Sequence, residues 1–132
     1  MSKLFLFLRT WGPSLLMMVA IFCFSSIPSG AMPNFGPDDF LVKKGGHAAG
    51  YALLALANLR AFPKGRRDGV GWDRKRWWLA WLFAVLYSAT DEFHQSFVPG
   101  RHAALTDVGI DALGAAAGLL LWGWFQRRKQ KS

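Results

Sequence analysis

The sequence contains a single cysteine, Cys23, so no disulfide can form within the chain. This cysteine lies inside a long apolar run, where we expect it to be a packing residue. There is also no internal repeat, low-complexity tract or sign of a second domain, so residues 1–132 are interpreted as one domain. Charged residues make up only 18% of the chain and hydrophobic residues 52%, a balance that is unusual for a soluble domain of this length.

The apolar residues are concentrated in four blocks, at roughly 4–27, 45–63, 77–97 and 105–125. Each block is close to the ~20 residues that a helix needs to cross the hydrocarbon of a bilayer. The sequence therefore predicts an all-α fold, a bundle of four transmembrane helices.

Acidic residues are few, with 8 Asp and Glu against 16 Lys and Arg, which gives a net charge of +8. The basic residues lie between and beside the apolar blocks, above all in 60–76, which includes Arg66 and Arg67, and in 127–131. This pattern follows the positive-inside rule better than it fits a nucleic-acid interface. We therefore expect no nucleic-acid partner, a multi-pass protein of the cytoplasmic membrane, and cytoplasmic N and C termini.

This topology places the loops near 28–43 and 98–104 on the outer side, and the outer side then lacks tryptophan. All seven tryptophans, including Trp72, map to the predicted cytoplasmic end, where interfacial Trp is common.

The first block also resembles a signal peptide, because Lys3 precedes it and SSIPSGA offers small residues near a cleavage point. The topology of the later blocks favours a retained helix.

Ionisable residues are scarce inside the blocks, yet they follow helical spacing where they occur. Lys44, His47 and Tyr51 share one stripe of the second block, and Asp107 and Asp111 share one of the fourth. Ionisable groups within membrane helices cost several kcal/mol unless they pair or reach water. We therefore predict that they converge on one polar pocket facing the extracytoplasmic side, with a purely structural network of ion pairs as the alternative.

The sequence offers candidate residues for catalysis and for ligand binding in this pocket. If the protein is an enzyme, the candidate catalytic residues are His47, Asp91, Glu92 and His94. The candidate binding residues are Lys44, Tyr51, Gln95, Arg101, Asp107 and Asp111.

Three motifs in these blocks resemble the VanZ-like family of small bacterial membrane proteins. They read Lys44-x-x-His47-x-x-x-Tyr51, then TDEFHQSFVPGR at 90–101, then Asp107-x-x-x-Asp111-x-x-Gly114. The likeness covers roughly residues 11–125. It implies a cell-envelope protein, and the member that gives the family its name is associated with lowered susceptibility to teicoplanin, a lipid-bearing glycopeptide antibiotic. Asp111 stands where we expect Asn in many relatives.

The sequence leaves three functions open, namely a ligand-binding protein, an enzyme and a carrier. A binder would hold a lipid head group or a lipid-linked envelope precursor, with Lys44 and Arg101 suited to phosphate oxygen atoms. A membrane-embedded hydrolase or transferase acting on a lipid-phosphate substrate would use His47 or His94 as general base. A proton-coupled carrier is disfavoured, because the polar residues stop near the outer end.

The sequence also leaves the cofactor and the oligomeric state open. The histidines and carboxylates could hold Zn²⁺, Mn²⁺ or Mg²⁺, but no close motif such as His-Glu-x-x-His supports one of them. The expected partners are the lipid bilayer and a lipid-linked envelope precursor.

Overall fold

The computed structural model describes residues 1–64 and 73–132, and within these ranges it contains helices and no strands. The expectations for Arg66, Arg67 and Trp72 lie outside the described residues. The elements are α1 (Lys3–Ser25), the 3-10 turns η1 (Ser29–Ala31) and η2 (Gly36–Asp38), α2 (Asp39–Ala61), α3 (Arg74–Gln95) and α4 (Leu105–Lys131). The prediction of an all-α fold with four helices is confirmed for the described part of the chain.

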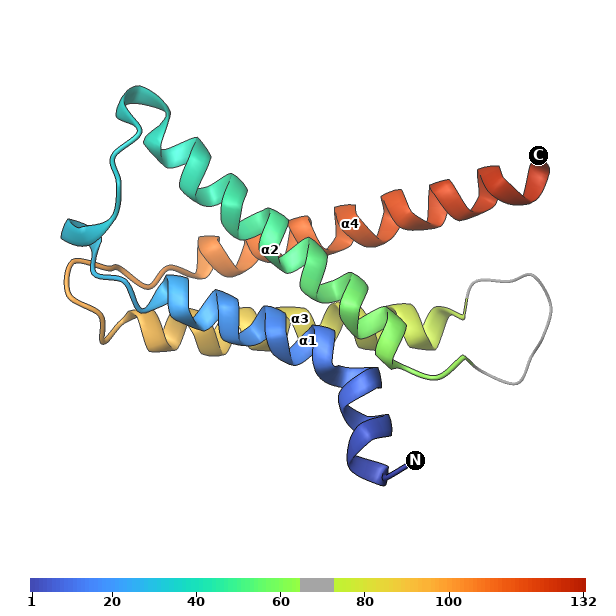
Figure 1. The fold of residues 1–132 in the computed structure, drawn as a ribbon. Coiled ribbons are helices and arrows are strands. Elements are labelled where there is room, and N and C mark those ends of the chain that lie inside the picture. The colour runs from blue at the N-terminus through green and yellow to red at the C-terminus, as the bar shows by residue number, and fades with distance from the viewer. Residues whose placement is uncertain (65–72) are drawn as a thin grey trace.

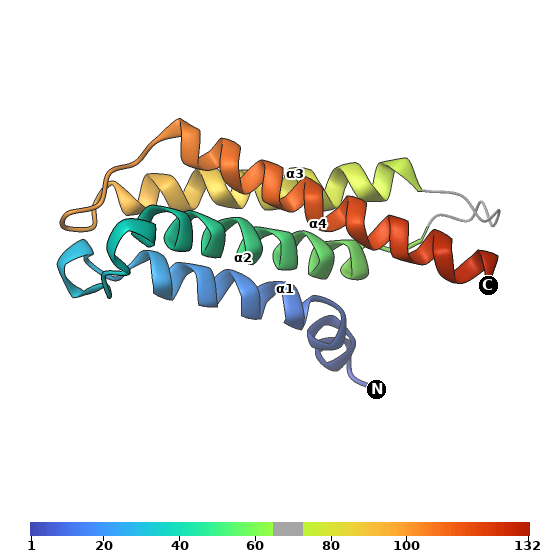
Figure 2. The same cartoon turned by 90° about the horizontal axis from the view of Figure 1, so that it is seen from above.

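The four helices alternate in direction along one axis (Figure 1). The linkers 26–38 and 96–104 lie together at one end, which we call the linker end. Both chain termini, the end of α2 and the start of α3 lie toward the opposite end, which we call the termini end (Figure 2). An even number of antiparallel helices explains why both termini share an end.

Two helices begin earlier than the apolar blocks predict. Helix α2 begins at Asp39, and the residues 39–43 that were assigned to the preceding loop form its first turns. Asp39 Oδ1 accepts a hydrogen bond from the backbone of Phe35 (3.1 Å), and its Oδ2 pairs with Lys43 Nζ at 2.7 Å, one turn along the helix. Such i, i+4 pairs and an acidic first turn stabilise a helix start. The preceding Gly36 and Pro37 favour a loop, whereas the local charge pair starts the helix at Asp39.

The other two unexpected boundaries have similar local causes. Helix α3 begins at Arg74 because Asp73 caps it, accepting a hydrogen bond from the backbone of Arg76 at 3.2 Å. Helix α4 runs on to Lys131, beyond the predicted end at 125, through Gln, Arg and Lys. These residues favour helix, and cations in the last turn suit its dipole.

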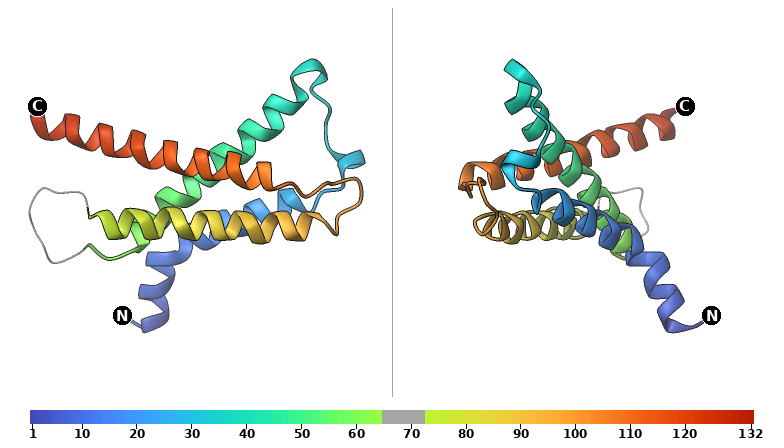
Figure 3. Two further views of the ribbon diagram at one scale, coloured as in Figure 1. Left: turned by 180° about the vertical axis from the view of Figure 1, so that it is seen from behind. Right: turned by 60° about the vertical axis from the view of Figure 1, so that its left-hand side comes forward.

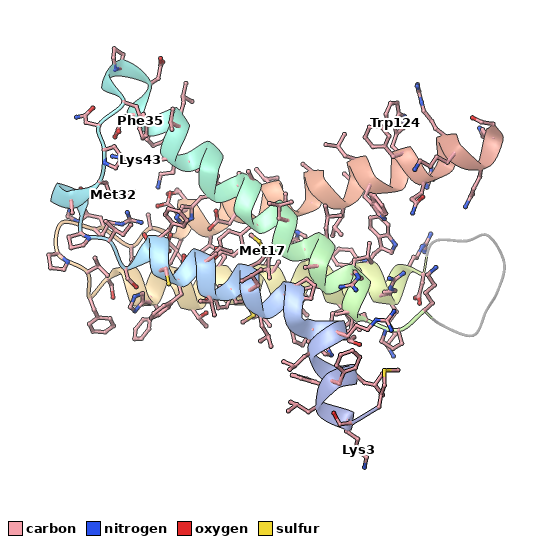
Figure 4. All side chains as sticks on the ribbon, in the orientation of Figure 1. Lys3, Met17, Met32, Phe35, Lys43 and Trp124 are labelled. Atoms are coloured by element: carbon pink, nitrogen blue, oxygen red, sulfur yellow. The ribbon has the colours of Figure 1, made fainter. Side chains whose placement is uncertain are left out.

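Helix α1 bends near Pro13, and its first turns leave the bundle (Figures 1 and 4). Proline removes a backbone donor and clashes with the carbonyl four residues earlier, so it kinks a helix. Figure 4 shows Lys3 far from the other helices and Met17 among them. Residues 3–10 are accordingly all exposed.

The closest packing joins α2 to α4, which cross in Figure 3. Small residues face each other there, Ala48 and Ala52 on α2 against Gly114 and Gly118 on α4. A Cβ added to Gly114 would lie 2.7 Å from the Cα of Ala48, so only glycine fits. The arrangement is the small-residue packing of membrane helices.

The bundle exposes large apolar side chains along its length. More than half of the side-chain surface is exposed at several of them, for example at Leu16, Val19, Leu86, Leu113 and Leu120. Helices α1 and α4 are long and apolar enough to cross a membrane. Exposed apolar side chains on helices of this length suit a membrane protein, and two of the four expected spans have the required length and hydropathy among the described residues.

We predict that Gly114→Ala lowers the thermal unfolding midpoint in detergent, because the new methyl group overlaps Ala48. Overpacking of this kind costs about 1–3 kcal/mol. Gly109→Ala, on the same helix, is the matched control, because nothing lies within 4 Å of its added Cβ. That control should be neutral or stabilising, since alanine favours helix over glycine. Equal midpoints for the two variants would contradict the packing described here.

Candidate functional site

Asp111 of α4 is the most deeply buried carboxylate at the linker end, with 1% of its surface exposed. Its Oδ2 accepts a hydrogen bond from Ser88 Oγ of α3 at 2.7 Å. Its Oδ1 lies 3.5 Å from His47 Nδ1 of α2 and has no hydrogen-bond partner among the described residues. Asp111 thus connects α4 to α3 by a hydrogen bond and faces His47 of α2 with an oxygen atom that accepts no hydrogen bond.

Glu92 of α3 lies close to His47 and Asp111 and is also buried. Its Oε2 accepts a hydrogen bond from the backbone of Ala104 at 3.1 Å. Ala104 is the N-cap of α4 and offers no side-chain cap of its own, so the glutamate supplies the anion that a helix start favours. Glu92, His47 and Asp111 each present one possible ligand atom, and these atoms all lie within 4.8 Å of one another.

Asp91, the neighbour of Glu92 in sequence, faces α1. Its Oδ2 accepts hydrogen bonds from Ser25 Oγ at 2.7 Å and from Gln95 Nε2 at 3.1 Å. The Gln95 carbonyl in turn accepts from the Arg101 guanidinium at 2.8 Å, and this guanidinium also contacts Met32 Sδ. Arg101 is therefore connected to Asp91 through Gln95, while Asp91 Oδ1 stays without a hydrogen-bond partner among the described residues.

Lys44 and Asp107 form an ion pair between α2 and the first turn of α4. Both side chains are partly exposed, the lysine more so, and Lys44 Nζ also lies 5.9 Å from the centre of the Phe40 ring. This pair borders the cluster formed by His47, Glu92 and Asp111. The lysine is thus already engaged by a carboxylate.

Tyr51 lies one helical turn beyond His47 on α2 and is almost completely buried. Its ring centre is 6.1 Å from that of His47 and 6.4 Å from that of Tyr87. The Tyr51 hydroxyl has no hydrogen-bond partner among the described residues. It supplies a polar group below the carboxylates in an otherwise apolar region.

The structure separates the two candidate histidines. His47 faces the carboxylate of Asp111, whereas His94 Nε2 lies 3.0 Å from Ser26 Oγ and the His94 ring stacks on Phe22 of α1 at 4.4 Å. His94 therefore faces α1 and stays apart from the group formed by His47, Glu92 and Asp111. Of the two, His47 is better placed for chemistry.

Two residues that the sequence analysis did not single out complete the site, Ser25 on α1 and Ser88 on α3. Both are fully buried, and each donates a hydrogen bond to a carboxylate. Ser88 precedes Glu92 by one helical turn, so its spacing on the polar stripe of α3 was a usable signal. Ser25 closes an apolar block and had no comparable signal.

A groove with a volume of about 370 Å³ lies elsewhere, between α3 and α4. It is lined by apolar side chains such as Trp77, Trp81 and Leu119, and it shares no residue with the carboxylate cluster. The expected polar pocket thus remains a prediction. The observed feature is a buried polar cluster whose most exposed members are Lys44 and His47.

The comparisons with known proteins give a family. The family model described as VanZ/LLP1 matches residues 4–126, nearly the whole chain. No curated protein matches the chain, and no solved structure does. The family match covers α2 and α3 completely, most of α1 and α4, and every residue of the site described above. The chain therefore belongs to the VanZ/LLP1 family.

Proposed function

We propose that the chain crosses the bacterial inner membrane four times, with cytoplasmic termini and the linker end outside. The antiparallel arrangement supports this, because α2 and α3 lie beside two helices that are long and apolar enough to span. Basic residues are concentrated toward the termini end, in 74–76 and 127–131. Basic residues favour the cytoplasmic side of membrane proteins.

A cysteine-labelling experiment tests this topology. In a Cys23→Ser background, His102→Cys at the linker end should react with a membrane-impermeant thiol reagent in intact cells. Ser132→Cys at the C-terminus should react only after the membrane is permeabilised. Labelling of Ser132→Cys in intact cells would contradict cytoplasmic termini, and protection of His102→Cys would contradict an exposed linker end.

The function proposed for the linker end is binding of the polar part of a lipid-linked envelope ligand, which connects the protein to glycopeptide susceptibility. One observation carries this proposal. Asp91 Oδ1 and the Tyr51 hydroxyl are buried without hydrogen-bond partners among the described residues. Unpaired buried polar groups cost about 1–3 kcal/mol each, and a ligand that pairs with them recovers that cost.

The charges indicate which ligand groups fit. The cluster and its border contain more carboxylates than cations, namely Asp91, Glu92, Asp107 and Asp111 against Lys44 and Arg101. Lys44 already pairs with Asp107, and Arg101 already donates to Gln95. The unpaired carboxylate oxygen atom of Asp91 accepts hydrogen bonds and cannot donate them. Hydroxyl, amide and amine groups of a sugar or peptide therefore fit better than phosphate.

The second candidate function is hydrolysis or group transfer on a lipid-linked phosphate substrate. The proximity of His47 Nδ1 to Asp111 Oδ1 favours it, because a carboxylate beside one imidazole nitrogen orients the ring and leaves the other nitrogen for proton transfer. Turnover of the ligand by purified protein distinguishes this function from binding alone.

Mass spectrometry of lipids that co-purify with the protein tests the binding function. A lipid-linked envelope precursor should accompany the wild type and should be lost from Asp91→Asn. Expression of the wild type, but not of this variant, should raise the minimal inhibitory concentration of teicoplanin. Asp39→Asn is the matched control, because Asp39 pairs with Lys43 outside the cluster. Folded wild type that carries no such lipid, or equal loss from both variants, would contradict the proposal.

A further inference from the structure

We propose that His47, Glu92 and Asp111 bind one divalent metal ion, with Zn²⁺ as the best match. The three residues come from α2, α3 and α4, and their ligand atoms lie within 4.8 Å of one another. The inference deepens the proposed function, because it concerns the same site and rests on that function for the ligand that would meet the metal. The binding of the ion itself can be measured without any such ligand.

The separation of His47 Nδ1 from Asp111 Oδ1 fits two ligands of one ion. Hydrogen bonds from nitrogen to oxygen in proteins are about 2.7–3.2 Å long, so 3.5 Å is long for a direct bond. Two ligands that each bind a tetrahedral Zn²⁺ at about 2.0–2.2 Å lie about 3.3–3.6 Å from each other. The observed distance is that of a close ion pair, and it also fits two ligands of one ion.

The unpaired Asp111 Oδ1 is a separate observation that points to a ligand. The side chain is 1% exposed, and the oxygen atom that lacks a hydrogen-bond partner is the one facing His47. Nearly all buried polar atoms in proteins have a partner, so an exception needs an explanation. A cation between Asp111, His47 and Glu92 would pair this oxygen atom and neutralise the two buried carboxylates.

The surrounding contacts are those expected around metal ligands. Ser88 donates a hydrogen bond to the other oxygen atom of Asp111, and the backbone of Ala104 donates one to Glu92. Such bonds fix the orientation of ligating carboxylates and support metal affinity. Each carboxylate therefore keeps its second oxygen atom for the ion.

The donor set selects the kind of ion. One imidazole and two carboxylates suit Zn²⁺, whereas Ca²⁺ takes six to eight oxygen ligands and Mg²⁺ keeps several waters. Three protein ligands leave a fourth position of a tetrahedral ion open. His47 is the most exposed of the three, so the open position faces the partly exposed border where Lys44 lies.

The test is elemental analysis of detergent-purified protein, followed by titration of chelator-treated protein with Zn²⁺ alone. The wild type should bind one Zn²⁺ per chain, and Zn²⁺ should raise its thermal unfolding midpoint. His47→Ala and Glu92→Gln should weaken binding at least about 10-fold, and Ser88→Ala about 10- to 100-fold. Glu92→Gln retains an oxygen acceptor for Ala104, so α4 keeps its cap.

The controls are the neighbouring groups that face elsewhere. His94→Ala removes a histidine that contacts Phe22 and Ser26, and Asp91→Asn alters a carboxylate that binds Ser25. Both should keep one Zn²⁺ per chain with wild-type affinity. Circular dichroism of every variant confirms that the helices are formed before binding is compared.

The possible results distinguish a failure of the metal site from a failure of the proposed function. Folded wild type that takes up no Zn²⁺, or His47→Ala that binds it as the wild type does, overturns the metal site. Loss of Zn²⁺ from His94→Ala equal to that from His47→Ala also overturns it. A co-purified lipid-linked precursor without metal would leave the proposed function standing, whereas bound Zn²⁺ without such a lipid would leave only the metal site.

Discussion

The constraint on which the structure depends is the cost of burying three carboxylates in an apolar bundle. Asp91, Glu92 and Asp111 are each at most 5% exposed. An isolated buried charge is far costlier than a paired one, so each must be met by donors from another part of the chain. The donors are Ser25 for Asp91, the backbone of Ala104 for Glu92 and Ser88 for Asp111. These contacts tie α3 to α1 on one side and to α4 on the other.

Close packing of α2 against α4 then brings His47 beside the carboxylate of Asp111. Ala48 follows His47 directly in the sequence, and Gly114 lies three residues after Asp111, so the backbone contact between Ala48 and Gly114 is adjacent to the ionisable pair. Because two small residues meet there, the helix axes approach closely and His47 reaches the carboxylate. A glycine without any functional group thereby sets the geometry of the site.

The sequence predicts the four helices and the stripes of side chains along each of them, because both follow from residue periodicity. Lys44, His47 and Tyr51 share a stripe of α2 as expected, and Glu92 faces a different neighbour from Asp91, as its angular offset on the helix predicts. Periodicity within one helix cannot say which helix a stripe meets. The separation of His94 from His47 therefore required the tertiary structure, as did the hydrogen bond from Ser25, which depends on where α1 packs.

The start of α2 shows a different limit of the sequence. Its first turn holds the exposed apolar residues Phe40, Leu41 and Val42 between Asp39 and Lys43, and the pair of Asp39 with Lys43 stabilises it. The preceding Gly36 and Pro37 favour a loop, so the sequence alone places these residues before the helix. Capping and charge pairing extend a helix beyond the segment that packs against its neighbours. The ion pair of Lys44 with Asp107 then joins this part of α2 to the first turn of α4.

The central claim is that helix packing places His47 of α2 beside Asp111 of α4. Cysteine crosslinking in native membranes tests it most directly, in a chain that carries Cys23→Ser. The pair His47→Cys with Asp111→Cys should react rapidly with a short bifunctional thiol reagent. The pair His94→Cys with Asp111→Cys should react slowly, because His94 faces α1. Equal rates, or faster crosslinking of the His94 pair, would contradict the arrangement.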